Sequence, residues 1–597
     1  MISLWIIILL VYLIAGLIAL RYPRISYSTV AIGSSFTLYL LFTGFIHAEP
    51  VATYFILISS TVWLFLSLFS LSYERSRLLA MSFAFTTGAM LIILLSRDAI
   101  TFLLGWEGMT IASFLSIYLH GDSKKSAYMF LVFGELSTVL ITSGFAWASS
   151  LSGSFAFSSW VGTVDWDWIY LLIASGFTVK MAMFPFHIWL PEAHSKAPAN
   201  MSAQLSAIMT LMGLYGLVMF LTPSFPSAWV GAFLLIMGGI TAIIGALHAA
   251  VCDHVKILPA YSTVENDGVL MAMVGAVIVT FQLGSTTVAG FVLVALLFYA
   301  FAHSIAKSLL FAVAGHIERD GEYLGGTYRI TRWTAFAGFL AAMSLAGVPP
   351  LPGFVGEWAA LESLFQSFYL ADMAVRIATI IIGALVALTA GISIIAMSKY
   401  IVHGVDRRKT GRAEIGDTGF AIGAAVILLM GLFPQYVFSL LSPATVEIMG
   451  VHANNYLGSL LGIPDGMLII SGAGFGVLSP TMIALFLVVN FGIVYVFMRN
   501  PITRRRVARP WSGGLENEEY PTRGHSSILL LTQRWVFKTE RMKQRDASVN
   551  FYESIARSYL SFSERFRIAL MPGNDRRYIL YILIALLTFL AVVYAIP

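Results

Sequence analysis

Apolar residues run through this chain in long stretches, and polar residues are confined to the short intervals between them. A membrane-spanning helix needs roughly 20 mostly apolar residues, and the pattern predicts about 16 such helices. Their centres fall near residues 11, 38, 62, 87, 109, 138, 178, 212, 240, 274, 300, 350, 387, 430, 489 and 587. The predicted fold class is therefore an all-α polytopic membrane protein.

Prolines interrupt two of these spans. The seventh reads KMAMFPFHIWLPEAH from Lys180, and the twelfth, from about Trp333 to Phe368, is interrupted by GVPPLPGF. Because proline removes an amide donor and clashes with the preceding turn, each span is expected to form two half-helices at membrane depth. The two spans lie five apart and so have opposite orientations, as in transporters with inverted repeats and a midplane ion path. Kinks without a function are the alternative.

The charges in the loops predict the orientation in the cell membrane. If odd-numbered spans end in the cytoplasm, the cytoplasmic loops hold most of the lysines and arginines, and the opposite loops hold little beyond Arg97 and Arg376. The first span, Ile2 to Leu20, has no basic residue before it, so we expect a retained helix and not a cleaved signal peptide. Both termini are predicted to lie outside the cell.

Residues 500–577 are polar and basic and depart from this pattern. Within them, one face carries an apolar stripe at helical spacing, formed by Phe551, Ile555, Tyr559, Phe562 and Phe566. We expect an amphipathic helix on the cytoplasmic surface of the membrane, held by a last span over residues 578–597. A partly ordered tail is the alternative.

The composition excludes several classes of protein. With 58% hydrophobic residues, 11% charged residues and a mean hydropathy of +0.83, the chain is not a water-soluble enzyme. Its net charge of +5 comes from short loops, which gives no indication of nucleic acid binding. The single cysteine, Cys252, excludes a disulfide framework and a cysteine-ligated cluster, and no metal-ligand spacing such as HExxH occurs. We expect no metal and no redox cofactor in this chain.

Ionisable residues nevertheless occur inside the predicted spans, where a charge is costly unless it is paired, hydrated or functional. Glu107 has no other charge within eight residues on either side, so its partner is expected on another helix, and Lys180 at the first break is the natural candidate. His303 and Lys307 are four residues apart and share one helix face. Glu357 follows the second break. Together these residues predict a row of acids and bases that carries protons sideways through the protein.

Each of these residues has a structural alternative. Glu107 and Lys180 could form a salt bridge with no further role, and His303 could be a hydrogen-bonded core histidine. Glu135 and Lys399 are further candidates for the relay, but they lie near the predicted span ends, where long side chains reach the membrane surface.

Five segments together resemble the antiporter-like subunits of respiratory complex I, of energy-converting membrane-bound hydrogenases of the formate hydrogenlyase type and of Mrp sodium/proton antiporters. They are WEGMTIASFLSIYL around Glu107, KMAMFPFHIWLPEAHSKAP from Lys180, KILPAYSTVENDG from Lys256, HSIAKSLLFAVAG from His303 and SLAGVPPLPGFVGEW with Glu357. The resemblance covers roughly residues 75–410 and implies fourteen core helices with two inverted five-helix repeats, each containing a broken helix.

The resemblance also implies how the chain is organised. The expected parts are helices one to three at 1–77, the first repeat at 78–222, the second repeat at 229–402, helices 14 and 15 at 415–499, the amphipathic segment at 500–577 and the anchor helix at 578–597. It assigns a role to each member of the predicted row. Glu107 and Lys180 would form the functional ion pair. His303 and Lys307 would form the central relay, and Glu357 would exchange protons with the far side of the membrane.

Two positions depart from the family pattern. Many members have a lysine where this chain has Leu211. The relay would then pass through water or through side chains, for which the candidates are His248, Ser206, Thr210 and Lys256. Members also commonly have an aspartate two residues before the lysine of the AYS motif, where this chain has His254, with Asp253 one residue earlier.

These observations predict a proton-translocating subunit of a redox-driven assembly related to complex I. We expect it to move ions without a redox centre of its own, and we expect iron-sulfur clusters, a nickel-iron centre, flavin or quinone only in partner subunits. The segment RPWSGGLENEEYP favours the hydrogenase-like or ferredoxin-linked branch, although Gly513 stands where relatives have cysteine. The expected partners are other membrane subunits, including antiporter-like ones, the peripheral redox subunits indirectly, and the lipid bilayer.

Two other functions fit the same residues. One is a subunit of an Mrp-type sodium/proton antiporter without a redox partner, and the other is a lone transporter of an organic solute. Carboxylates and water serve protons and sodium alike, so the sequence leaves the transported ion open.

Overall fold

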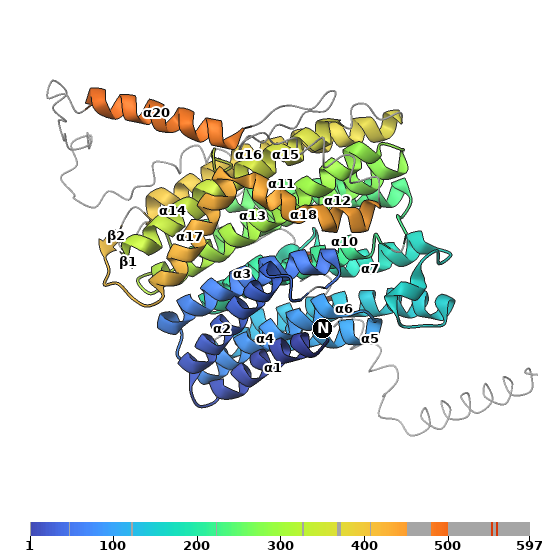
Figure 1. Ribbon diagram of the computed structural model, residues 1–597, viewed down its shortest axis with the longest axis horizontal. Helices are drawn as coiled ribbons and strands as arrows, with labels where there is room; N and C mark the ends of the chain where they lie inside the picture. The colour runs from blue at the N-terminus through green and yellow to red at the C-terminus, as the bar shows by residue number, and fades with distance from the viewer. Residues whose placement is uncertain are drawn as a thin grey trace, which may run out of the picture. The chain divides into compact units, whose positions relative to one another are not determined.

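The computed structural model describes most of residues 2–498 and a few residues between 551 and 561. Within the first range it leaves out 47, 121–122, 223, 325–327, 367–371, 406–407 and 451–478. The predicted anchor helix and nearly all of the predicted amphipathic segment lie outside the described residues. Most of the described residues are helical, which confirms the predicted all-α class (Figure 1).

Six long helices form the first part of the chain. They are α1 (Ile2–Ala19), α2 (Pro23–Phe42), α3 (Pro50–Tyr73), α4 (Arg77–Leu95), α5 (Ala99–Leu119) and α6 (Lys124–Ser152), followed by a 3₁₀ turn, η1 (Phe157–Trp160). The start of α5 is fixed by Asp98, whose Oδ1 accepts a hydrogen bond from the Thr101 amide over 2.9 Å. Such a cap satisfies an amide that has no partner inside the helix.

The seventh span breaks as predicted. Here α7 (Trp166–Lys180) ends, residues 181–185 are not helical, and η2 (Phe186–Ile188) and α8 (Trp189–Lys196) resume the helix. Ala182 has a left-handed backbone with φ 54°, and the Phe184–Pro185 peptide is cis. The break leaves Lys180 in the last turn of a half-helix, where the free carbonyl groups favour a cation.

The twelfth span breaks as predicted too. It consists of α14 (Arg332–Leu345) and α15 (Pro352–Gln366), with a cis Pro349–Pro350 peptide between them. Gly347 turns the chain with φ 62°, a conformation that other residues rarely adopt. A side chain at Gly347 would also collide with the carboxylate of Glu357. The break therefore brings Glu357 back against the end of the first half-helix.

The eighth span is continuous but contains a π-helical turn. It runs through α9 (Ala199–Gln204), the π turn η3 (Leu205–Met209) and α10 (Thr210–Met219). A π turn alters the direction of its carbonyl groups relative to a regular helix and is common at functional sites. It lies where Ser206 and the adjoining Thr210 face the interior.

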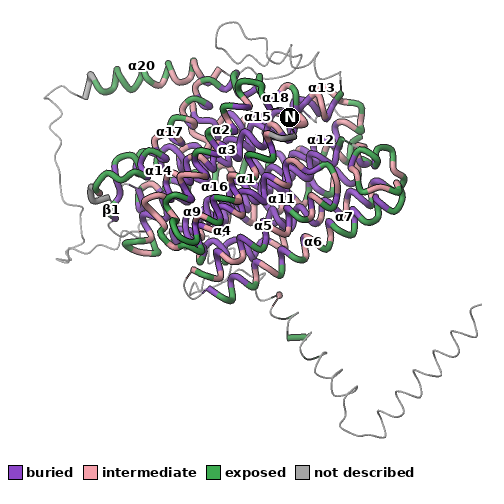
Figure 2. Tube along the Cα trace, turned by 60° about the horizontal axis from the view of Figure 1, so that its bottom comes forward, coloured by how far each residue is buried: buried purple, intermediate pink, exposed green. Residues whose placement is uncertain are grey.

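Glycines bring α11 (Ala228–Val251) and α12 (Ile257–Gln282) into close contact. A Cβ atom on Gly238 would overlap the backbone of Gly268 and Ala272, so the two helices touch backbone to backbone. Helix α12 and the next helix, α13 (Thr286–Glu318), are each 94% buried over their most apolar window, against 39% for α6 (Figure 2). Ionisable groups on α12 and α13 are therefore enclosed by protein.

The rest of the described chain completes the bundle. It contains α16 (Met373–Tyr400), which continues into a π turn, η5 (Ile401–Val405), then α17 (Asp417–Leu432), α18 (Pro434–Met449) and α20 (Pro480–Met498). Two short strands, β1 (Tyr328–Ile330) and β2 (Arg408–Thr410), pair in parallel. Helices α17 and α18 meet at 86° around Phe433 and Pro434, a bend that was not predicted.

Ten described helices are each long and apolar enough to cross a membrane, or up to eleven spans if the bent pair counts as one. The predicted spans near residues 11, 178, 350 and 489 fall on shorter or broken helices and are not among these ten. The predicted number of spans and the proposed boundaries between the parts stay predictions.

Candidate functional site

Lys180 lies in the interior at the first break and is 2% exposed. Its Nζ donates a hydrogen bond to Thr110 Oγ1 on α5 over 2.9 Å. The same nitrogen lies 5.0 Å from the ring centroid of Phe130 and 5.8 Å from that of Trp106. Aromatic faces attract a desolvated cation, so the lysine sits between two rings and one hydroxyl group.

The carboxylates of Glu107 and Glu135 act on Lys180 electrostatically from a distance. Among the described residues, the direct partner of the ammonium is Thr110, one turn along α5 from Glu107, and not Glu107 itself. Glu107 Oε1 is buried and has no hydrogen bond partner in the described part of the chain. This is not the geometry of a structural salt bridge, in which the two charges touch.

Glu135 lies elsewhere on its helix than we predicted. It lies about three turns into α6, far from either end, and its side chain is exposed. Val132 and Val139, about one turn away on either side, are 64% and 60% exposed. A long side chain cannot reach the membrane surface from there, and a carboxylate on an apolar face is costly unless other protein covers it. This face of α6 is therefore a candidate contact with another subunit.

Lys307 and His303 are buried together on α13. Lys307 Nζ donates a hydrogen bond to the Pro259 carbonyl of α12 over 3.3 Å. The carboxylates that act on it electrostatically are Glu265 and Asp267, both on α12. The shared helix face predicted for His303 and Lys307 is thus matched by two acids on the neighbouring helix.

These two acids were not among the predicted site residues. Glu265 accepts hydrogen bonds from Ser393 Oγ of α16 at both carboxylate oxygens, over 2.8 and 2.7 Å. Asp267 Oδ1 lies 3.8 Å from His303 Nε2. Both acids belong to AYSTVENDG, and two acids inside an otherwise apolar span are the same signal that selects Glu107.

The π turn supplies hydroxyl groups next to this cluster. Ser206 Oγ lies 2.6 Å from Thr263 Oγ1 of α12, and the Ser206 carbonyl faces the His303 ring. The Thr210 hydroxyl interacts with the Asp267 carboxylate. The structure therefore brings Ser206 and Thr210 together with His303, as the route around Leu211 requires.

Glu357 lies at the second break, and its carboxylate interacts electrostatically with Glu265. Tyr299 of α13 lies between the two acids, since its ring packs against Gly356 and both carboxylates act on its hydroxyl group. That hydroxyl donates a hydrogen bond to Asn266 Oδ1. Tyr299 therefore contacts both α12, through Asn266, and the half-helix that carries Glu357.

His248 lies beside the first break. Its ring stacks on Tyr261 of α12 with 4.8 Å between centroids, and it lies 6.5 Å from the His187 ring. Tyr261 is one turn before Glu265 on α12. His248 therefore lies between the first break and the α12 acids. Its route between them is separate from the route through Ser206 and Thr210.

Lys256 and Lys399 are not part of this row. Lys256 pairs with Glu318 over 2.6 Å and donates to the Ala197 carbonyl over 2.8 Å. Lys399 is 5% exposed, pairs with Asp253 over 3.1 Å and also donates to the Ala250 and Cys252 carbonyls. Both lysines hold the connection between α11 and α12. Their relay role stays a prediction, whereas Lys399, contrary to expectation, does not reach out to the membrane surface.

His254 explains the second departure from the family pattern. Its Nδ1 accepts hydrogen bonds from the Lys256 and Ile257 amides, over 3.1 and 3.4 Å, as a capping carboxylate would at the start of α12. Burial, and then the charge of Lys256, lower the pKa of this histidine to about 4. The ring is therefore neutral at neutral pH and can act as an acceptor.

Residues 96–383 match one protein family, which is described as "NADH:quinone oxidoreductase/Mrp antiporter, TM". This range contains every member of the row from Glu107 to Glu357. Over this range the chain matches the family. The resemblance predicted from the five segments is thus confirmed, and both broken helices, Lys180 and Lys307 lie within the matched range.

Relatives of this chain occur in two kinds of assembly. Hydrogenase-4 component B of Escherichia coli is 26% identical over 91% of this chain and 88% of its own length. Na(+)/H(+) antiporter subunit A1 of Staphylococcus epidermidis is 28% identical over 60% of this chain and 48% of its own length. A chain in the structure of an archaeal membrane-bound sulfane sulfur reductase has the same fold, with a TM-score of 0.78, 20% identity and coverage of 98% of this chain and 99% of that one.

Proposed function

We propose that this chain is the proton-translocating, antiporter-like membrane subunit of a redox-driven assembly of the hydrogenase type. The observation that carries the proposal is the row of ionisable groups that runs from the buried Lys180 through the buried His303 and Lys307 to the partly buried Glu357. Its support from relatives is the likeness to hydrogenase-4 component B over nearly the whole chain.

The row consists of three stations. The first is Lys180 with Thr110 and the more distant Glu107. The second is His303 and Lys307 with the two α12 acids, and the third is Glu357 behind Tyr299. Protons would pass between stations along hydroxyl groups and water, because neighbouring polar atoms such as Ser206 and Thr263 already lie within hydrogen bond distance.

A small displacement at the first station is enough to drive transfer. The two carboxylates favour the charged form of Lys180, so moving or neutralising one of them would release its proton toward the second station. Moving one charge across 100 mV costs about 2.3 kcal/mol, which is the size of the change that the two carboxylates would have to exert on Lys180. The exposed Glu135 is where a partner subunit could apply that change.

We propose the same orientation that the loop charges predict, with both termini outside the cell and the amphipathic segment on the cytoplasmic side. We also propose that iron-sulfur clusters and other redox centres belong to partner subunits. Among the described residues, no group of three or more His, Cys, Asp or Glu side chains could hold a metal ion.

The test replaces Lys180 by alanine in the intact assembly. In inverted membrane vesicles, proton uptake driven by the electron donor should be lost, while electron transfer falls or continues without pumping. The matched control is Lys196→Ala, which removes an exposed lysine from the end of α8. Normal pumping in Lys180→Ala would contradict the proposal.

A second candidate is a subunit of a sodium/proton antiporter without a redox partner. The likeness to antiporter subunit A1 favours it, although that likeness extends over 48% of the relative's length. Identification of the subunits that copurify with this chain separates the two, because hydrogenase or iron-sulfur subunits support the first and small antiporter subunits the second.

A further inference from the structure

Asp267 is the acid of the second station that faces His303, and its own part in the transfer is undefined so far. It lies on α12, is 2% exposed, and faces His303 with 3.8 Å between Oδ1 and Nε2. Its Oδ2 has no hydrogen bond partner among the described residues, and neither has either ring nitrogen of His303. Burying a carboxylate this incompletely bonded is unfavourable, so a purely structural purpose does not explain it.

Asp417 shows what a structural acid looks like in the same protein. It is also buried, but Thr331 and Thr334 donate to its Oδ1, over 2.6 and 3.4 Å, and the Glu414 amide donates to its Oδ2 over 3.0 Å. Each oxygen of Asp417 is therefore satisfied. Asp267 differs in having its free oxygen inside the proton-carrying cluster.

The position of Asp267 matches the gap in the row. Leu211 supplies no ionisable group to the eighth span, and the hydroxyl of the adjacent Thr210 interacts with Asp267. The Asp267 charge also acts on Lys307. One carboxyl group thus lies next to the hydroxyls of the eighth span, to His303 and to Lys307.

We propose that Asp267 carries protons between the eighth span and His303, in place of a basic residue at position 211. In the step, the protonated Asp267 gives its proton to His303 Nε2 directly or through one water molecule, leaving a carboxylate and an imidazolium. The imidazolium then gives a proton to neutral Lys307, and Asp267 takes up the next proton from the Thr210 side. No electron moves in either transfer. The inference rests on the proposed function.

The test measures proton uptake per electron transferred in vesicles that hold the intact assembly. Asp267→Asn should lower this ratio to about a tenth or less, and Asp267→Glu should retain about half of it, because only a carboxyl group can carry the proton. Asp417→Asn is the matched control and should leave the ratio unchanged. A normal ratio in Asp267→Asn would overturn the inference.

Two further measurements keep the outcomes distinct. If Lys180→Ala stops pumping but Asp267→Asn does not, only this inference fails, whereas normal pumping in both variants removes the proposed function too. If Asp267→Asn does not assemble, infrared difference spectra of wild type and Asp267→Glu during a pH change decide. A carboxyl carbonyl band that shifts in Asp267→Glu supports the inference, and identical spectra overturn it.

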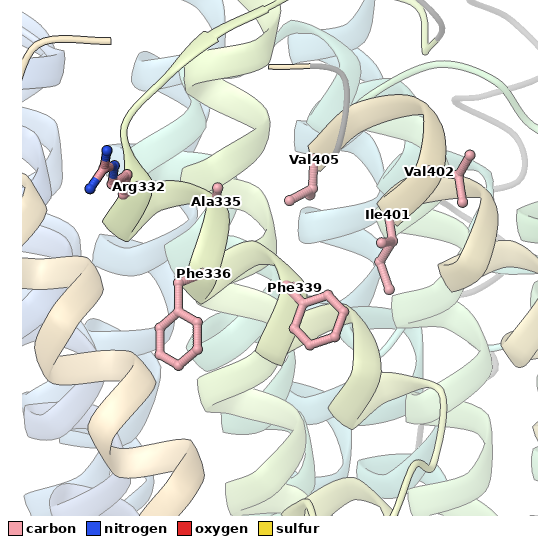
Figure 3. A pocket seen from close by; sticks show the side chains of 7 residues that line it. All are labelled: Arg332, Ala335, Phe336, Phe339, Ile401, Val402 and Val405. Carbon is pink, nitrogen blue, oxygen red and sulfur yellow. The ribbon is translucent and has the colours of Figure 1, made fainter. Parts of the chain in front are cut away.

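A groove along the exposed face of α14 supports a second and independent inference. It has a volume of about 480 Å³ and is lined by Arg332, Ala335, Phe336, Phe339, Ile401, Val402 and Val405 (Figure 3). Phe336 and Phe339 are 42% and 41% exposed, and Val402 is 45% exposed. The walls are therefore apolar, while the one charged group stands at the first residue of α14.

Arg332 supplies the charge complementarity that identifies the occupant. It is exposed and forms no ion pair within the described part of the chain. A basic group at a helix end beside an apolar groove suits the phosphate of a lipid, with an acyl chain along the groove. We infer that this groove binds an anionic phospholipid, with its phosphate on Arg332 and one chain against Phe336 and Phe339.

The test compares lipid retained by the purified chain after reconstitution with phosphatidylglycerol or phosphatidylcholine, counted by native mass spectrometry. Wild type should retain phosphatidylglycerol about fivefold better than Arg332→Gln, because a surface charge near anionic lipid is worth about 1 kcal/mol. Arg24→Gln, at the start of α2, is the matched control and should behave as wild type. Equal retention by Arg332→Gln, or of both lipids by wild type, would overturn the inference. So would loss of the bound lipid in the intact assembly, because a protein partner would then fill the groove.

Discussion

Lys180 and Lys307, the two buried lysines of the proposed proton row, have acids arranged in opposite ways. The acids that act on Lys180 lie on outer helices, where Glu107 is partly buried and Glu135 is exposed. The acids that act on Lys307, Glu265 and Asp267, are enclosed within the core. The first lysine can therefore be influenced from outside the chain, while the second exchanges charge only with groups of its own chain. On the proposed function, the outer site, around Lys180, would respond to partner subunits and the inner site, around Lys307, would relay protons.

Removing each lysine should separate the two sites most clearly. Lys307→Ala leaves two enclosed carboxylates without their cation and should destabilise the chain by about 3–5 kcal/mol. Lys180→Ala removes one hydrogen bond and leaves acids that reach the surface, so about 1–2 kcal/mol should be lost. Unfolding of the two purified variants by denaturant in detergent measures the difference. Equal losses would mean that the inner site is not more enclosed than the outer one.

The packing of α12 against α11 positions the acids around Lys307 and not those around Lys180. Gly238→Val forces a side chain into the backbone of α12 and should destabilise the protein by about 1–3 kcal/mol. Gly290→Ala, on α13 where a Cβ meets no atom within 4 Å, is the control and should cost nothing. Thermal unfolding in detergent checks both. A stable Gly238→Val would contradict the backbone contact that positions the α12 acids.

Glu135 tests the outer site. Glu135→Gln should reduce proton uptake by the intact assembly about tenfold, equivalent to roughly 1.4 kcal/mol, and leave the stability of the isolated chain unchanged. Glu49→Gln is the control, because Glu49 forms a surface ion pair with Arg97 over 2.7 Å. Unchanged proton uptake in Glu135→Gln would contradict the prediction that a partner subunit acts on Lys180 through Glu135.

His254 gives the smallest effect and concerns the cap of α12. Its pKa is lowered to about 4 in the folded protein, below the ordinary value of 6.5, so its stabilising effect is complete above about pH 6.5 and is lost as the pH falls toward 4. His254→Ala should cost about 1 kcal/mol at pH 7.5 and less at lower pH. Unfolding measured at several pH values checks this, and a cost that does not vary with pH would contradict the neutral cap.

The pattern of apolar runs was sufficient for the fold class and for both breaks, because proline has the same effect on any helix. The five segments were sufficient for the family. Isolated charges in apolar runs pointed to Lys180, Lys307 and Glu357, since burial of a charge has few explanations. Within one helix, these features depend on the local sequence alone.

The partners of these residues were decided by tertiary structure. Thr110, not Glu107, bonds Lys180, and Asp267 faces His303, because helix faces meet only after the whole bundle has packed. Likewise, Lys399 anchors the connection after α11, about 150 residues away in sequence, which no local pattern encodes. The amino-acid sequence by itself determined which groups are forced into the membrane. Packing decided which of them can pass a proton to one another, since that depends on distances of a few ångströms between separate helices.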